Sequence, residues 1–171
     1  MTGTIKVDTI QNNGGTTGLT IDSNGVVTQP AIPAWRVGLT GNQQVDATGN
    51  TTIIFNNSTT SNCFLQGGVT LSSGLITVPV AGVYQMNLVC RFDNVGSGYM
   101  VGRLQKNQTG AGTSDGFIIV GNGLSTNYDN LTGSEVFRCA ANDTLSVEIF
   151  SSADAGYQIN NNTTLTGFLV G

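Results

Sequence analysis

Residues 76–86 read Ile76-Thr-Val-Pro79-Val-Ala-Gly82-Val-Tyr84-Gln-Met86, and this stretch indicates the class of fold. The β-branched run stops at Pro79, because proline has no backbone N–H to donate to a neighbouring strand. Gly82 permits a tight bend, and the chain restarts as an alternating segment with an aromatic residue near its head. The stretch therefore predicts a strand, a corner and a second strand. It favours a binding or structural protein over an enzyme.

The composition argues against several classes of protein. A chain of 171 residues suffices for one ordinary domain and a small appendage. Only 9% of the residues are charged and the net charge is −4, whereas a nucleic-acid partner requires clustered Lys and Arg. The hydrophobic share of 39% is enough to form a core. Gly, Pro or a polar residue interrupts every apolar run, so we expect no membrane insertion.

The start of the chain and its cysteines indicate where it is made. Residues 1–8 contain no basic segment followed by an apolar block, so no secretory signal is expected there. Cys63, Cys90 and Cys139 are an odd number for a disulfide framework, and buried reduced thiols are the simpler interpretation. Both features predict synthesis in a reducing cytosol.

Short alternating segments separated by Gly, Asn, Ser or Asp recur along the chain, and helical periodicity is absent. This pattern predicts an all-β protein. In the clearest strand, residues 83–92, one face is expected to carry Tyr84, Met86, Leu88, Cys90 and Phe92. Further strands are expected at residues 34–37, 51–55, 75–78, 99–106, 117–120, 134–139, 145–149 and 165–170.

The last expected strand differs from the others because both of its faces are apolar. Leu165 and Leu169 point one way, while Phe168 and Val170 point the other way. A strand in a two-sheet sandwich needs only one apolar face for its own core. The second face therefore predicts a subunit interface, and an overhanging loop is the alternative.

Residues 1–30 are expected to form a separate anchor or stalk before a head at residues 31–171. Apolar and polar residues alternate at both ends of this segment, and Asn24-Gly25 is a strong hairpin signal. So short a segment buries too little surface to fold alone, and it requires several wrapped copies or a larger scaffold. Its expected apolar contacts are Ile5, Val7, Ile10, Leu19 and Ile21.

Five motifs resemble, in order, those of the globular head of complement component one-q, which has a TNF-like jelly-roll fold. They are Pro33-Ala-Trp35, Ile53-Ile-Phe-Asn56, the stretch from Gly74 to Tyr84, Arg103-Leu-Gln-Lys-Asn107 and Leu165-Thr-Gly-Phe-Leu169. The resemblance covers residues 31–171. It implies a two-sheet antiparallel jelly-roll sandwich that assembles as a tight homotrimer. It also implies that Trp35, Tyr84 and Phe168 lie in the core or against the three-fold axis.

Two departures from that family argue against an animal complement or hormone role: a collagen-like stalk and a secretion signal are both missing. The first thirty residues instead resemble the N-termini of bacteriophage appendage proteins. The residues that carry this similarity are 5–11, 18–22 and 25–27. The resemblance implies a virion protein that is assembled inside a bacterium.

The sequence offers little for catalysis. It contains no histidine, which removes the usual general base and the commonest metal ligand. Glu135, Asp143, Glu148 and Asp154 could pair for glycoside hydrolysis, but solvated turns explain these carboxylates better. The segment that starts at Asp22 begins like a calcium loop and lacks the later ligands. We therefore expect no enzyme activity, no metal and no cofactor.

Two polar loops, residues 107–115 and 151–162, are candidates for contact with host sugars. If the last strand ends beside the stalk, alternating strand directions place both loops at the far end of the head. Amides, hydroxyls and a nearby aromatic ring can bind a sugar, and plain solvated loops are the alternative. The candidate residues are Asn107, Thr109, Ser114, Phe117, Asp154, Tyr157 and Asn160.

These observations predict a bacteriophage structural protein located in the virion. It would be a homotrimeric fibre or spike on tail or capsid that contacts other virion proteins and, through its loops, host surface glycans. One alternative is a decoration or cement protein that stabilises the capsid without a receptor. Another is a secreted lectin or signalling module.

Overall fold

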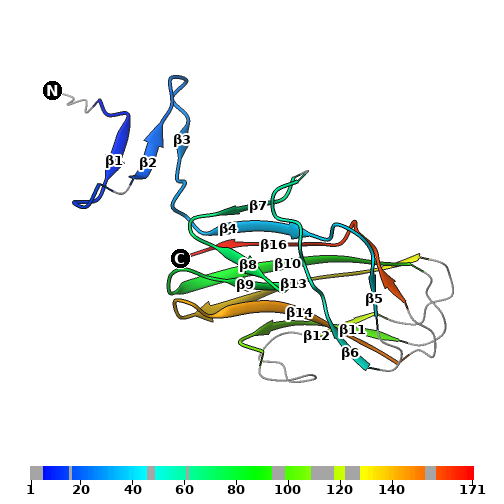
Figure 1. Cartoon of the computed structure of the whole chain (residues 1–171). Helices are drawn as coiled ribbons and strands as arrows, with labels where there is room; N and C mark the ends of the chain where they lie inside the picture. Colours follow the sequence, from blue (N-terminus) through cyan, green and yellow to red (C-terminus); the bar gives the residue numbers. More distant parts are fainter. Residues whose placement is uncertain are drawn as a thin grey trace.

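The computed structural model describes residues 6–15, 17–45, 49–60, 62–93, 99–108, 118–121, 128–152 and 157–171, without the side chains of residues 118–121 and 128. The regular elements of these residues are all β-strands, which confirms the predicted all-β class. Within the same residues, no helix is long and apolar enough to cross a membrane. Figure 1 shows a two-layered head with a small separate sheet beside it.

The first layer of the head is a seven-stranded antiparallel sheet. The long strand β10 (Gly82–Asp93) pairs along its whole length with β13 (Tyr128–Cys139) on one side. On its other side it pairs with β16 (Thr164–Leu169), which in turn pairs with β4 (Ala34–Gly38). The remaining short strands of this layer are β7 (Phe64–Gln66), β15 (Gln158–Ile159) and β5 (Gln43–Gln44).

The second layer is a six-stranded antiparallel sheet around β14 (Thr144–Ser151). This strand pairs with β11 (Met100–Lys106) on one side and with β9 (Leu75–Thr77) and β6 (Gly49–Thr52) on the other. The edges are β12 (Ile118–Gly121) and β8 (Thr70–Ser72). The two layers form the predicted two-sheet sandwich.

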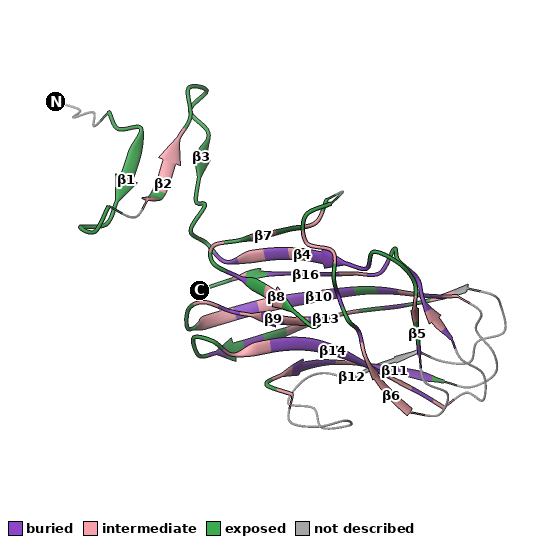
Figure 2. Ribbon diagram, viewed as in Figure 1, coloured by how far each residue is buried: buried purple, intermediate pink, exposed green. Residues whose placement is uncertain are grey.

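The core lies between the two sheets, where Figure 2 shows the buried residues concentrated. All five inward side chains predicted for the long strand, from Tyr84 to Phe92, are buried, which confirms that prediction. The rings of Trp35 and Tyr84 lie 6.2 Å apart in this core. Facing them from the second sheet are Leu104, Leu145, Val147 and Ile149.

The predicted corner is present between β9 and β10. The Tyr84 hydroxyl donates a hydrogen bond of 2.9 Å to the carbonyl oxygen of Val80, four residues earlier. Burial raises the pKa of Tyr84, so the hydroxyl keeps the proton that it donates. The aromatic residue near the start of the long strand thus also holds the loop before it.

The predicted strand at residues 51–55 is shorter than expected, because β6 ends at Thr52. The side chain of Gln43 takes over the backbone hydrogen bonds there: its Nε2 donates to the Thr52 carbonyl, and its Oε1 accepts from the Ile54 N–H, both at 2.8 Å. Ile53 and Phe55 are nevertheless buried in the core. The apolar pattern therefore indicated burial correctly but not strand pairing.

The N-terminal sheet consists of β1 (Thr9–Gln11), β2 (Thr17–Ile21) and β3 (Val27–Thr28). The Asp22 carboxylate accepts hydrogen bonds from the N–H groups of Asn24 and Val26, which closes the predicted hairpin. Leu19 and Ile21 are half-buried, while Val7 and Ile10 are exposed, and Ile5 lies outside the described residues. The role of this sheet as an anchor stays a prediction.

Candidate functional site

The outward side of the seven-stranded sheet is the candidate functional surface, and we call it the uncovered face. Its side chains stand in rows across the strands. One row passes from Gln66 through Ala34, Phe168 and Gln85 to Val136. The next row carries Phe64, Arg36, Thr166, Asn87 and Ser134, and the third carries Gly38, Thr164, Val89 and Thr132.

Large apolar side chains are exposed on the uncovered face although the core is complete without them. The exposed fractions are 43% for Phe168, 45% for Phe64, 48% for Val89 and 53% for Val136. Val170, which follows β16, is 58% exposed. Exposed apolar side chains that share one surface are characteristic of an interaction site.

The polar side chains in these three rows are mostly uncharged, and three of them form hydrogen bonds with one another. Gln85 Nε2 donates to Asn87 Oδ1 and to Ser134 Oγ, each at 3.2 Å. Arg36 is the one charged side chain in the three rows. A surface of this kind can be covered by another protein without burying many charges, whose burial is unfavourable.

The outward side of the six-stranded sheet has a different character. Arg103 Nη1 lies 2.7 Å from Glu148 Oε1, and the Glu148 side chain is only 1% exposed. The Arg103 guanidinium also lies 5.8 Å from the ring centre of Phe150. Glu148 was expected in a solvated turn, and that expectation is wrong: it lies in the middle of β14, where both faces are buried.

The five residues predicted for the core or a subunit interface fall into two groups. Trp35, Tyr84 and Leu165 are buried between the sheets. Phe168 lies on the uncovered face with Val170 just beyond the end of its strand, and both are exposed in the single chain. The doubly apolar last strand is therefore present as the sequence predicted, and its assignment to an interface stays a prediction.

The structure does not bring the two predicted sugar-binding loops together. β11 runs back toward the corner between β9 and β10, so Asn107 lies beside Asp143 and Thr144. Asn160 lies at the opposite end, where its amide donates to the Asp93 carboxylate. The expectation that both loops lie at the far end is thus wrong, because the direction of β11 was assigned incorrectly.

Two of the predicted sugar contacts are also unavailable at the surface. The ring of Tyr157 is fully buried, and its carbonyl oxygen accepts hydrogen bonds from the Val45 N–H and from Gln44 Nε2. Asn160 is buried as well. An aromatic ring can bury its apolar surface in the core or stack it on a sugar. Sequence composition does not distinguish these two roles. Thr109, Ser114, Phe117 and Asp154 lie outside the described residues.

The described residues contain no group of three or more Cys, Asp or Glu side chains that could hold a metal ion. Sequence reasoning missed Arg36, which is the charged residue of the three rows described above. A signal was present, because Arg36 follows Trp35 in a strand whose buried face was predicted, so its side chain had to point outward.

No protein-family model matches this chain, and no curated protein matches it. Solved structures do. The globular domain of zebrafish complement 1qA protein is 18% identical, with 81% of this chain and 98% of that chain covered and a TM-score of 0.56. Eiger TNF from S. frugiperda is 14% identical over 82% of this chain and 94% of its own, with a TM-score of 0.61.

The head is a TNF-like jelly roll. A third similar structure, murine APRIL, is 15% identical, with 81% of this chain and 98% of that chain covered and a TM-score of 0.57. At these identities the likeness shows the fold alone. These structures confirm, for the fold, the resemblance to TNF-like jelly-roll heads that the sequence motifs indicated.

Proposed function

We propose that this chain is a bacteriophage virion protein, a homotrimeric fibre or spike on tail or capsid, whose jelly-roll head contacts host surface glycans. Residues 1–30 would attach the head to the particle. The observation that carries this proposal is that one chain leaves two apolar surfaces uncovered, one on the head and one on the N-terminal sheet. The bacteriophage-like residues 5–27 support the assignment to a virion.

The uncovered face supports self-association of the head. Phe168 and Val136 lie in one row, with Gln85 between them. Val89 lies in the third row of the same face. A second copy placed over the part of this surface formed by β16, β10 and β13, with Arg36 on β4 left open, would bury apolar side chains at about 25 cal/mol for each Å² removed from water. The resemblance to the TNF-like heads, which implies a trimer, supports three copies.

The N-terminal sheet supports a stalk built from several chains. Its strands contain only three, five and two residues, and a sheet of this size is not stable alone in water. Val7, Ile10, Val26 and Val27 are exposed on the single chain. Three copies that wrap around one another would cover these side chains and hold the heads together at their bases.

The assembly is tested by placing a charge on the uncovered face. Phe168→Asp should convert a trimer into a folded monomer, because the carboxylate would be buried without a partner in the assembly but exposed in the single chain. Ile54→Asp is the matched control, since Ile54 is also 43% exposed and lies outside the uncovered face. Light scattering gives the mass, and circular dichroism reports the fold. A monomeric unmodified chain at micromolar concentration contradicts the trimer.

The virion assignment is tested separately. Mass spectrometry of purified particles should detect this chain, and deletion of residues 1–30 should abolish its incorporation. The full chain should adsorb to a host envelope fraction. Incorporation without any adsorption would point to a decoration protein instead, and absence from every particle preparation would contradict a virion role.

A further inference from the structure

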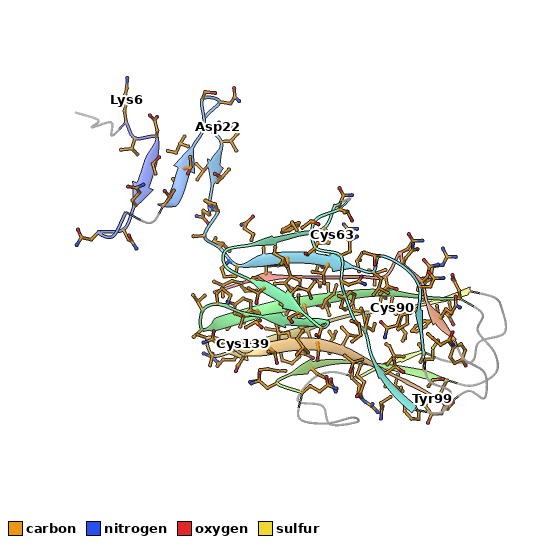
Figure 3. All side chains as sticks on the ribbon, viewed as in Figure 1. Lys6, Asp22, Cys63, Cys90, Tyr99 and Cys139 are labelled. Atoms are coloured by element: carbon orange, nitrogen blue, oxygen red, sulfur yellow. The ribbon has the colours of Figure 1, made fainter. Side chains whose placement is uncertain are left out.

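A hollow of about 400 Å³ opens at one edge of the uncovered face, between the end of β4, the start of β16 and the segments at residues 57–60 and 62–63. Gly38 and Asn57 exchange backbone hydrogen bonds of 2.9 and 3.0 Å, which fasten the first of these segments to β4. Asn57 Oδ1 also accepts from the N–H and the hydroxyl of Thr60. The wall of the hollow is therefore held by hydrogen bonds. Figure 3 shows Cys63, one of its lining residues, beside β4 and β7.

Arg36 lines the hollow where it meets the uncovered face. Its Nε is buried and has no hydrogen-bond partner among the described residues. Arg91 and Arg103, by contrast, each form an ion pair with a carboxylate. A buried donor without an acceptor is unfavourable, and the loss is largest for a charged group. One N–H group of the Arg36 guanidinium, at the wall of the hollow, is thus left without an acceptor in the described part of the chain.

The other lining groups suit a small polar ligand. Asn57, Asn62 and Asn161 contribute amides and Thr164 contributes a hydroxyl, and none of the described residues that line the hollow is acidic. The volume falls at the small end of the range of ligand sites, about 300–1,000 Å³. Because the net charge of the chain is −4, its overall field does not attract anions, and recognition of an anion has to be local.

We propose that this hollow binds a carboxylate-bearing sugar, such as a uronic acid residue of a host surface polysaccharide. The guanidinium of Arg36 would pair with the carboxylate, a geometry in which arginine forms two parallel hydrogen bonds. The Asn amides and Thr hydroxyl would bind the sugar hydroxyls. This inference rests on the proposed function, and it names the class of glycan and the site that binds it.

Binding is tested on the full chain with glucuronic acid, glucose and inorganic sulfate as probes, measured by titration calorimetry or ligand-observed NMR. Glucuronic acid should bind at least ~10-fold more tightly than glucose or sulfate, since it alone offers both the charge and the hydroxyls. In Arg36→Gln, the affinity for glucuronic acid should fall to the affinity for glucose. Arg138→Gln, which removes an exposed arginine on the outward side of the same sheet, should leave the affinity unchanged.

Cys63 offers an independent readout at the site. It is half-buried in the wall of the hollow, whereas Cys90 and Cys139 are buried. Burial raises the pKa of Cys90 to about 12, so its thiol stays protonated and unreactive. Glucuronic acid should slow the alkylation of Cys63 by iodoacetamide severalfold, and glucose should not. In Arg36→Gln the protection should disappear, and Cys63→Ser confirms which thiol reacts.

Three results would overturn the inference. One is equal affinity for sulfate and glucuronic acid, which would indicate a general anion site. Another is no binding of any probe. The third is loss of the trimer in Arg36→Gln, which would assign the guanidinium to a second copy of the chain. A particle-bound trimer that binds no acidic sugar would overturn this inference and leave the proposed function intact.

Discussion

Gly167 in β16 lies directly opposite Trp35 in β4 and packs against its indole ring. A Cβ atom at Gly167 would lie 2.6 Å from Trp35 Cε2, which is much shorter than a normal van der Waals contact distance. This contact joins the opening and closing motifs of the jelly-roll head. The glycine is required there by the space that the buried Trp35 occupies.

We expect Gly167→Ala to destabilise the head by about 1–3 kcal/mol, the usual range when a methyl group is forced into a packed core. Urea unfolding followed by tryptophan fluorescence measures the change, because Trp35 is the single tryptophan of the chain. Gly41→Ala is the control, since no atom lies within 4 Å of its added Cβ. A control that loses as much stability as Gly167→Ala would show that packing on Trp35 is not the cause.

Tyr84→Phe removes the hydroxyl that binds the Val80 carbonyl. We expect a loss of about 0.5–1.5 kcal/mol, the net value of a single hydrogen bond, with the fold retained. Tyr99→Phe should change the free energy of unfolding by less than about 0.5 kcal/mol, because the Tyr99 side chain is 46% exposed. Chemical denaturation compares the two variants. Equal effects would mean that the corner does not depend on this hydrogen bond.

The ion pairs Arg103–Glu148 and Arg91–Asp93 should differ in their effects on stability. Arg103→Gln leaves the buried Glu148 without its cation, and we expect a loss of about 3 kcal/mol, at the low end for a broken buried pair. Arg91→Gln should lose about 1 kcal/mol or less, because the Arg91 side chain is 35% exposed and its pair with Asp93 is screened by water. Thermal unfolding at neutral pH separates these outcomes. A larger loss in Arg91→Gln would contradict this ranking.

Asp143 should make stability depend on pH in acid. Its carboxylate accepts hydrogen bonds from Asn107 Nδ2 at 2.7 Å and from the Ala140 N–H at 2.8 Å, and these lower its pKa below the ordinary value of 3.8. A carboxylate with a lowered pKa in the folded state stabilises the protein above its ordinary pKa, and the contribution is lost as the pH falls through the folded value.

The comparison of Asp143→Ala with the unmodified chain tests this. The difference in the free energy of unfolding should be constant between about pH 5 and 7 and should shrink as the pH falls below the ordinary pKa of the carboxyl group. Urea titrations at a series of pH values measure it. A difference that does not change in acid would mean that the charge of Asp143 is not involved.

Local patterns predicted the burial of side chains well and their place along the head poorly. Alternation along β10 correctly assigned Tyr84 to Phe92 to the core, because a two-residue period follows directly from strand geometry. The burial of Tyr157 and Glu148 depends on which segments cover them, and this is a tertiary property. Asn107 was placed at the wrong end because that inference required the direction of every preceding strand.

The chain enters and leaves the jelly-roll head at one point. The N–H of Leu169 donates to the carbonyl oxygen of Pro33 at 2.9 Å, so the first and last strands of the head meet side by side. A segment with such adjacent ends can replace a surface loop of an unrelated protein without stretching its host. The head is therefore suitable for insertion into a loop of another protein. Peptides grafted into its opposite end, near Asn161, would be displayed away from that protein.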